Sequence, residues 1–445
     1  KSRSRGLGDV YKRQIQRPDG KVNPIDTDYQ IGQDNVALKV GPFGLDIHNR
    51  VFAISGMSII LFVVLTLTFR QQVEPFFAGL RGWLVSNLDW FFLSAGNVFV
   101  VVCLILIVTP LGRVRIGGTE ATPDYTYAGW LAMLFAAGMG IGLVFFGVSE
   151  PMSHFSAALG GVNVENGVRT DWAPLGAAEG DTSAASALGM AATIYHWALH
   201  PWSIYALLAL GLAIFSFNKG LPLTMRSIFY PLFGERVWGW TGHIIDILAV
   251  VATVFGLATS LGYGASQAAT GLNFLFGVPM TDMTQVVIIV IITALALISV
   301  VAGLDSGVKR LSEINMGLAA LLLLFVIVVG PTLAIMTGFF ENIMSYLANV
   351  PALSMPFGRE DVNYSQGWTA FYWAWWISWS PFVGMFIARV SKGRTVREFI
   401  TAVLIVPTTV TIIWMSVFGG MAIDQIVNNV GILGQDGLTL SLIHI

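Results

Sequence analysis

Residues 371–381 read Phe-Tyr-Trp-Ala-Trp-Trp-Ile-Ser-Trp-Ser-Pro and carry four tryptophans within seven positions. The run lies inside an apolar segment long enough to span a bilayer. A membrane helix needs tryptophan mainly at its two interfaces with water, so this density in mid-span calls for another explanation. Indole is the best aromatic face for a cation, and desolvation raises the attraction to about 2 kcal/mol or more. The segment therefore indicates a membrane helix that faces an organic cation.

The composition excludes a soluble domain. Hydrophobic residues make up 55% of the chain and charged residues 11%, whereas soluble domains carry about 25% charged residues. The net charge of −2 comes without a basic run that has interleaved aromatics, so we expect no nucleic-acid partner. The single cysteine, Cys103, excludes a disulfide within one chain. No nucleophile–base pair, phosphate loop or metal cluster is visible, so we expect neither an enzyme nor a cofactor.

Apolar runs of about 20 residues predict a multi-pass protein of the cell membrane. Lysine and arginine collect in alternate loops, eleven on one side against four on the other, which places the N-terminus in the cytoplasm. The eleven are Arg113, Arg115, Lys219, Arg226, Arg236, Lys309, Arg310, Arg389, Lys392, Arg394 and Arg397. The nine predicted spans are 49–69, 88–110, 127–147, 188–216, 242–266, 284–303, 313–338, 367–389 and 399–421.

Both ends of the chain differ in character from the rest. Residues 10–14 and 441–445 resemble translated sequencing-adapter sequence, so we expect residues 1–14 and 441–445 to be non-native. We assign 15–48 to a cytoplasmic N-terminal segment.

The third span contains three glycines at alternate positions, Gly138, Gly140 and Gly142. Each costs about 1 kcal/mol in a helix relative to alanine. One interpretation is a broken helix whose carbonyl groups face a substrate or a small cation. The other is close helix packing through small residues. The spacing alone does not choose between them.

Two aromatic clusters lie on separate spans. At about 100° per residue, Trp202 and Tyr205 lie about 140° and 80° from Trp197, on one broad face. Trp375, Trp376 and Trp379 fall within an arc of about 100° on the eighth span. Facing each other, the two clusters predict an aromatic box without a fixed anion, which suits a quaternary ammonium ion. The alternative for each cluster is a set of lipid-facing aromatics.

Three segments resemble the betaine/carnitine/choline transporter family. They are Gly138-Met-Gly-Ile-Gly-Leu-Val-Phe-Phe-Gly-Val-Ser-Glu-Pro151, the segment with Trp197, Trp202 and Tyr205, and the run from Trp373 to Met385 followed by Ala388-Arg389. The resemblance implies an all-α inverted-repeat fold of five plus five helices behind two leading helices. The leading helices would occupy 49–126, the first repeat 127–340, and an incomplete second repeat 341–440, with the last three helices missing. It also implies a possible homotrimer.

The resemblance further implies roles for individual residues. The family's box falls on Trp197, Trp202, Tyr205 and Trp376. Trp375 and Trp379 match its central binding position, Phe386 matches a gate, and Met139 lies beside the substrate. Backbone carbonyls of Ala136 and Met139 match one sodium site. Thr253 matches a second one, but Leu257 stands where another hydroxyl is expected.

We therefore expect a symporter that imports a quaternary ammonium compound, such as glycine betaine or choline, with Na⁺ or H⁺. The alternatives are a receptor or channel for organic cations and a sodium-independent exchanger of the carnitine type. Lys392, Arg394 and Arg397 are candidates for contact with anionic membrane lipid. We interpret Glu150 as a capping or gate residue. His196 and His200 lie four apart, but without a Glu or Cys partner nearby they predict no metal site.

Overall fold

The computed structural model describes residues 22–40, 43–138, 140–301 and 309–430. The predicted terminal segments 1–14 and 441–445 lie outside these residues, as does Met139. Within the described part, seven helical stretches are long and apolar enough to cross a membrane. They are Asn49–Thr68, Arg70–Val108, Thr182–Asn218, Trp240–Phe276, Asp282–Val301, Arg310–Val329 and Val396–Val427. The predicted all-α, multi-pass membrane fold is confirmed, whereas the division into inverted repeats stays a prediction.

The N-terminal part forms a hairpin followed by two long helices. Strands β1 (Asn35–Val40) and β2 (Phe43–His48) pair antiparallel, with Asn35 opposite His48. Helix α1 spans Asn49–Thr68 as predicted, but α2 spans Arg70–Val108 and begins 18 residues before the predicted 88. The first half of α2 contains many polar residues, so the apolar pattern did not predict a helix there. The 3₁₀ turn η2 (Pro110–Arg113) ends this part.

Two predicted spans are each broken into two helices. Helix α3 (Tyr127–Gly138) ends inside the glycine segment, and α4 (Ile141–Gly160) begins after an extended Gly140. Helix α5 (Thr182–Trp197) likewise ends at Ala198, before α6 (Leu199–Ala213). Pro201 has no N–H for the carbonyl group of Trp197, and its ring crowds that carbonyl group, which explains the second break. The helix-break interpretation of the glycine segment is therefore the one that the backbone adopts.

The middle of the chain departs from the predicted spans in two places, since α9 (Trp240–Phe276) continues ten residues past the predicted end at 266. The predicted span 313–338 is two helices, α11 (Lys309–Val329) and α12 (Thr332–Leu353), because Pro331 stops the first of them. The predicted repeat boundary at 340/341 falls inside α12. The other elements here are η3 (Ile214–Asn218), α7 (Met225–Ile228), α8 (Tyr230–Phe233), η4 (Gly234–Trp238), α9 (Trp240–Phe276) and α10 (Asp282–Val301).

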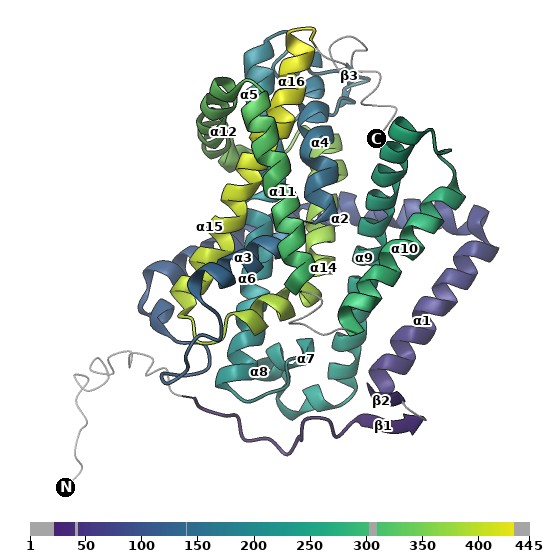
Figure 1. Ribbon diagram of the computed structural model, residues 1–445, viewed down its shortest axis with the longest axis vertical. Coiled ribbons are helices and arrows are strands. Elements are labelled where there is room, and N and C mark those ends of the chain that lie inside the picture. The colour runs from purple at the N-terminus through teal and green to yellow at the C-terminus, as the bar shows by residue number, and fades with distance from the viewer. Residues whose placement is uncertain (1–21, 41–42, 139, 302–308, 431–445) are drawn as a thin grey trace.

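The C-terminal elements complete the core. Thr395 caps the last long helix, since its hydroxyl accepts from the backbone N–H of Glu398 and the Glu398 side chain accepts in return. The elements are α13 (Val362–Tyr364), η6 (Ser365–Thr369), α14 (Ala370–Val390), α15 (Val396–Trp414), η7 (Met415–Gly419) and α16 (Gly420–Val427). The buried residues concentrate on α4, α5, α6, α14 and α15. Helices α1 and α10 lie at the edge of the molecule and expose apolar side chains, as lipid-facing helices do (Figure 1).

Residues 22–34, β1–β2, α7 and α8 lie at one end of the molecule, and β3 (Val164–Glu165) lies at the other (Figure 1). Strand β3 pairs with β4 (Val168–Arg169) in the loop between α4 and α5. At the N-terminal end, the proposed lipid-contacting arginines make protein contacts. The guanidinium of Arg394 is buried 5.1 Å and 4.7 Å from the ring centroids of Tyr127 and Trp130. Arg397 donates to the carbonyl oxygens of Ile107 and Thr109 at the end of α2.

Candidate functional site

The two aromatic clusters meet in the core. The ring centroid of Trp376 on α14 lies 5.6 Å from that of Trp197, 5.6 Å from Trp202 and 4.8 Å from Tyr205. All four side chains are 7% exposed or less. The structure thus brings together the four residues predicted to form the box. They are packed around Trp376 as a contact cluster, because these separations leave no room for a cation between the rings.

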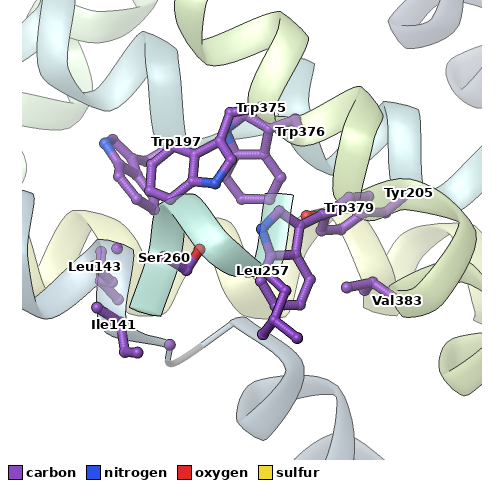
Figure 2. Close-up of a pocket in the computed structure, with 12 residues that line it drawn as sticks. Ile141, Leu143, Trp197, Tyr205, Leu257, Ser260, Trp375, Trp376, Trp379 and Val383 are labelled. Atoms are coloured by element: carbon purple, nitrogen blue, oxygen red, sulfur yellow. The ribbon is translucent and has the colours of Figure 1, made fainter. Parts of the chain in front are cut away.

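A cavity of about 250 Å³ lies beside this cluster. Figure 2 shows Trp197, Trp375, Trp376, Trp379 and Tyr205 on one side of it, with Ile141 and Leu143 on another. Small-molecule pockets usually measure about 300–1,000 Å³, so this cavity suits a compact ligand. Its lining consists of Gly140, Ile141, Gly142, Leu143, Trp197, Tyr205, Leu257, Ser260, Trp375, Trp376, Trp379 and Val383.

The glycine segment keeps the cavity open. A Cβ atom on Gly142 would lie 2.8 Å from Cη2 of Trp197 and 2.8 Å from Cη2 of Trp375. Gly140 is extended at the N-terminus of α4, with φ −108° and ψ −177°. Its carbonyl oxygen accepts the first bond of α4, from the N–H of Val144. The first N–H groups of a helix lack partners within it and favour negative charge. The start of α4 therefore gives the cavity a positively polarised edge.

Not every predicted residue lines the cavity. Trp202 lies behind Trp376 and is 1% exposed. Phe386 is half-buried on α14 and is not among the lining residues. The hydroxyl of Thr253 donates to the carbonyl oxygen of Ala249, 2.8 Å away within α9. Ala136 lies on α3 without a described side chain, and Met139 is outside the described residues.

Three indole N–H groups of the two aromatic clusters have no hydrogen-bond acceptor among the described residues. The Nε1 atoms of Trp202, Trp375 and Trp376 are buried and have no hydrogen-bond partner among the described residues. Trp375 and Trp376 line the cavity. A buried donor without a partner costs about 1–3 kcal/mol, so an acceptor on a bound ligand would recover that free energy. The cavity thus offers aromatic faces to a cation and N–H groups to an acceptor.

The structure adds a group that we did not predict at the site. Glu150 on α4 is fully buried, and its Oε2 accepts from Nε1 of Trp197 at 2.7 Å and from the hydroxyl of Tyr372 at 2.5 Å. Its Oε1 lies 2.6 Å from Nδ1 of His196 and 3.2 Å from Nε2 of His154. The expected box without an anion therefore has a carboxylate directly behind Trp197. The only signal in the sequence was an acidic residue directly after the third apolar span.

The prediction that His196 has no acidic partner is wrong, because Oε1 of Glu150 contacts its ring. Glu150 is 46 positions away in the chain, so local spacing did not show the contact. The ligand atoms of Glu150, His154 and His196 lie within 4.8 Å of one another, a donor set that can hold zinc. Hydrogen bonds between the same atoms account for this arrangement, and we interpret it as a hydrogen-bonded cluster.

Comparison with known proteins identifies the family. A profile of the betaine/carnitine/choline family transporters matches residues 50–437. This chain belongs to the betaine/carnitine/choline transporter family.

Individual relatives agree. A glycine betaine/proline/choline transporter of Vibrio parahaemolyticus is 88% identical over 415 residues, covering 93% of this chain and 75% of the relative. Glycine betaine transporter 1 of the same organism is 56% identical over 416 residues, covering 93% and 76%. The glycine betaine transporter OpuD of Bacillus subtilis is 45% identical over 347 residues, covering 77% and 65%. The expectation of a membrane transporter, not an enzyme, is confirmed.

In this family member, an aromatic layer closes one side of the cavity. The ring centroids of Phe146, Tyr263 and Trp375 lie 5.4 to 5.9 Å from one another. Trp375 lines the smaller cavity, whereas Phe146 and Tyr263 line a second cavity of about 990 Å³, which reaches Arg81 and Asp171. The three rings therefore separate the smaller cavity from the larger one.

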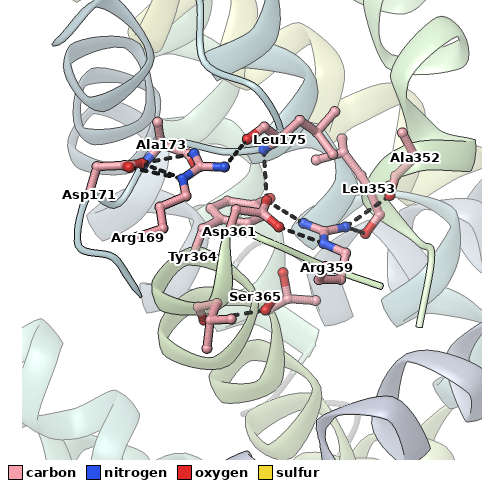
Figure 3. A network of polar contacts seen from close by, with 12 residues as sticks. Arg169, Asp171, Ala173, Leu175, Ala352, Leu353, Arg359, Asp361, Tyr364 and Ser365 are labelled. Atoms are coloured by element: carbon pink, nitrogen blue, oxygen red, sulfur yellow. Dashed lines mark hydrogen bonds and ion pairs between the residues drawn. The ribbon is translucent and has the colours of Figure 1, made fainter. Parts of the chain in front are cut away.

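Beyond the second cavity, a polar clamp fastens the loop after α4 to the segment after α12 (Figure 3). The carboxylate of Asp361 accepts from the guanidinium of Arg359 at 2.7 and 2.6 Å and from the backbone N–H of Leu175 at 2.7 Å. Arg359 also donates to the carbonyl oxygens of Ala352 and Leu353. Asp361 is 3% exposed. The transporter thus carries a buried ion pair that bridges two distant parts of its sequence.

A second ion pair in the same network joins Arg169 and Asp171. Burial alone would raise the pKa of Asp171, but hydrogen bonds from Arg169 and from the backbone of Asn163 and Ala173 outweigh it and lower the pKa. Because the folded-state pKa is lowered, the stabilisation is present above the unfolded pKa of about 3.9 and is lost as pH falls through the folded value.

Gly142→Ala should close the cavity. The added methyl group clashes with Trp197 and Trp375, and overpacking of this kind costs about 1–3 kcal/mol. We expect the affinity for tetramethylammonium, an onium probe without polar groups, to fall about tenfold. Gly262→Ala on α9 is the matched control, since a Cβ there meets nothing within 4 Å. Titrations of tryptophan fluorescence with purified protein measure both. Equal affinities for the two variants would contradict the assigned cavity.

Asp361→Asn should destabilise the transporter. The change leaves the guanidinium of Arg359 without its counter-charge, and breaking a buried pair costs about 3–5 kcal/mol. We expect a midpoint of thermal unfolding several degrees below that of the wild type, measured in detergent. Glu165→Gln, at an exposed position of β3, should stay within about 0.5 kcal/mol of wild type. If Asp361→Asn unfolds at the same temperature as Glu165→Gln, the clamp does not stabilise the protein.

Proposed function

We propose that this protein is a secondary transporter that imports glycine betaine and choline, with proline as a further substrate. The observation that carries the proposal is the cavity of about 250 Å³ walled by Trp197, Trp375, Trp376 and Trp379. An onium ion is attracted to indole faces electrostatically and cannot donate a hydrogen bond. The relative at 88% identity is named for these three substrates, which supports the same choice here.

The cavity is polar at one edge and aromatic at the other, and this favours a zwitterion. A carboxylate placed near Ile141 would face the N–H groups at the start of α4, where the helix dipole stabilises negative charge. The unpartnered N–H groups of Trp375 and Trp376 supply further donors. The trimethylammonium end would then lie against the indole faces. Glycine betaine, which has one carbon between its two charges, matches a cavity of this size.

The aromatic layer supports alternating access. Phe146, Tyr263 and Trp375 close the cavity toward the larger one, so that side of the pathway is shut in this conformation. The breaks before α4 and α6 lie in the same core, as expected for discontinuous helices around a midplane site. A receptor or channel needs no such closure. Closure on one side of a ligand-sized cavity therefore favours a carrier.

Sodium or proton entry is the proposed driving force. Helix α3 ends at Gly138 and α4 begins at Ile141, and backbone carbonyl groups at such a break can turn toward a cation. Thr253 bonds within its own helix, and Leu257 at the cavity has no oxygen side chain. The second sodium site implied by the resemblance therefore gains little support from these two residues. A sodium-independent exchanger of the carnitine type stays the alternative.

The N-terminus is proposed to face the cytoplasm. Loops that carry Arg115, Lys219 and Arg394 meet at the end of the molecule that holds residues 22–34. The backbone N–H of Ile116 donates to the carbonyl oxygen of Arg394, and that of Ile25 donates to Lys219. This gathering agrees with the asymmetry of basic residues, which favours the cytoplasmic side. The homotrimer and the contact with anionic lipid stay predictions.

Uptake of labelled glycine betaine tests the proposal. In cells without other osmolyte carriers, the protein should produce saturable accumulation against a gradient. Trp376→Leu should raise the half-saturating concentration about thirtyfold, because a desolvated cation–π contact is worth about 2 kcal/mol. Trp83→Leu, at a side chain 60% exposed on α2, is the control and should leave uptake unchanged.

The same assay separates the alternatives. Loss of accumulation without sodium indicates sodium symport, and loss only with a protonophore indicates proton symport. Accumulation that needs internal substrate and no ion gradient indicates an exchanger. Flux that rises linearly with concentration, or Trp376→Leu uptake equal to that of Trp83→Leu, would overturn the proposed carrier.

A further inference from the structure

A buried carboxylate stands behind one wall of the cavity without touching it. Trp197 lines the cavity, and its Nε1 donates to Oε2 of Glu150 at 2.7 Å. An indole N–H is a donor only, so Oε2 is the acceptor in this bond. Glu150 itself is 0% exposed and is not among the lining residues. The charge of Glu150 therefore reaches the cavity through one aromatic ring.

The surroundings of Glu150 are those of an ionised carboxylate. Its two oxygens have four contacts, with Trp197, Tyr372, His196 and His154, and an ionised carboxylate accepts about four hydrogen bonds. His196 fits a neutral ring that donates through Nδ1, because its Nε2 lies 2.9 Å from the hydroxyl of Thr369, which can donate to it. The donors come from α4, α5 and α14, so Glu150 also ties three helices together.

Among the described residues, no lysine or arginine contacts Glu150, and its ionisable partners are His196 and His154. In the part of the chain that the structure describes, the arginine near this cluster is Arg359, whose guanidinium lies 5.8 Å from the ring of Tyr364. Tyr364 separates it from His196, since its hydroxyl lies 3.4 Å from Nε2 of that residue. A buried charge is costly unless it is paired. Besides the two histidines, the position left for a counter-charge is the cavity, on the far side of the Trp197 ring.

We propose that Glu150 is a positioning residue that supplies the counter-charge of the onium ligand through the indole of Trp197. The charged hydrogen bond fixes the orientation of the ring and increases the electron density on its face. Because cation–π attraction is electrostatic, a more negative face binds a cation more strongly. Glu150 therefore selects for positive charge in the ligand and not for its shape. This inference rests on the proposed function, since it requires an onium ligand in the cavity.

A pair of ligands of equal shape tests the proposal. Glycine betaine and 3,3-dimethylbutanoate differ only in the central atom of the trimethyl group, which is N⁺ in the first and neutral carbon in the second. The ratio of their affinities for the purified protein measures selectivity for charge. Glu150→Gln keeps the size of the side chain and an acceptor for Trp197 but removes the charge. We expect it to lower the ratio about tenfold, with little change for dimethylbutanoate.

Tyr372→Phe is the matched control. It removes another hydrogen bond to the same Oε2 atom but leaves the charge and the bond to Trp197 in place. We expect this variant to keep the wild-type ratio. If Glu150→Gln weakens both ligands equally, its role is structural and the proposal is wrong. An unchanged ratio would overturn it as well.

A second measurement covers failure of Glu150→Gln to fold. Site-specific replacement of Trp197 by 3-benzothienylalanine exchanges the N–H for sulfur in a ring of the same shape. We expect the ratio to fall several-fold, and a wild-type ratio would overturn the proposal. The wild-type protein separates the two hypotheses. If the wild-type protein fails to bind glycine betaine, the proposed function is wrong. If it binds glycine betaine but the affinity ratio is the same in all these variants, only the proposed role of Glu150 is wrong.

Discussion

The contact of Trp376 with Trp197, Trp202 and Tyr205 is the interaction on which the rest of this structure depends. It joins α14 to the segment around the α5–α6 break, across more than 170 positions of sequence. Aromatic rings at these separations attract one another by about 0.5–1.5 kcal/mol per pair beyond their buried area. In a membrane, where lipid tails are as apolar as the side chains, such specific packing decides which helices associate. The cavity is what remains beside this cluster when the broken helices pack around it.

Buried polar groups follow a consistent rule in this protein. Each costs several kcal/mol unless it is satisfied, and most of those in the core are. Glu150 has four contacts, and Asp361 joins a guanidinium and a backbone N–H. Trp375 and Trp376 are the exceptions at the cavity, with buried N–H groups that have no partner among the described residues. Unsatisfied donors at a cavity wall are understandable if a ligand completes them.

The sequence predicted the fold class and the aromatic residues of the site because both follow from local patterns. Apolar length identifies membrane helices, and the unusual density of tryptophan marks a cation site. The sequence does not show that Trp202 lies behind Trp376 and away from the cavity. Helical angles place a residue on one face of a helix, but they do not fix its distance from the cavity. The sequence predicts only a capping or gate role for Glu150, because its hydrogen-bond partners are distant in the chain. Its partners His196, Trp197 and Tyr372 lie 46 to 222 positions away.

Helix boundaries were predictable only where an apolar run coincided with the helix. The first half of α2 is too polar for the pattern, and Pro331 divides one apolar stretch into α11 and α12. The spacing of the glycines allowed either a broken helix or close helix packing. In the folded protein the helix is broken there. Gly142 in fact serves both, because it follows the break and also lets two indoles approach.

The central claim is that indole faces in this cavity bind an onium ion by its charge. Site-specific replacement of Trp376 by mono-, di-, tri- and tetrafluorotryptophan changes the electrostatic potential of the ring with little change in its shape. Cation–π attraction predicts that the logarithm of the glycine betaine dissociation constant rises steadily with each fluorine, up to about thirtyfold in total. A dissociation constant that stays the same across the series would contradict the account.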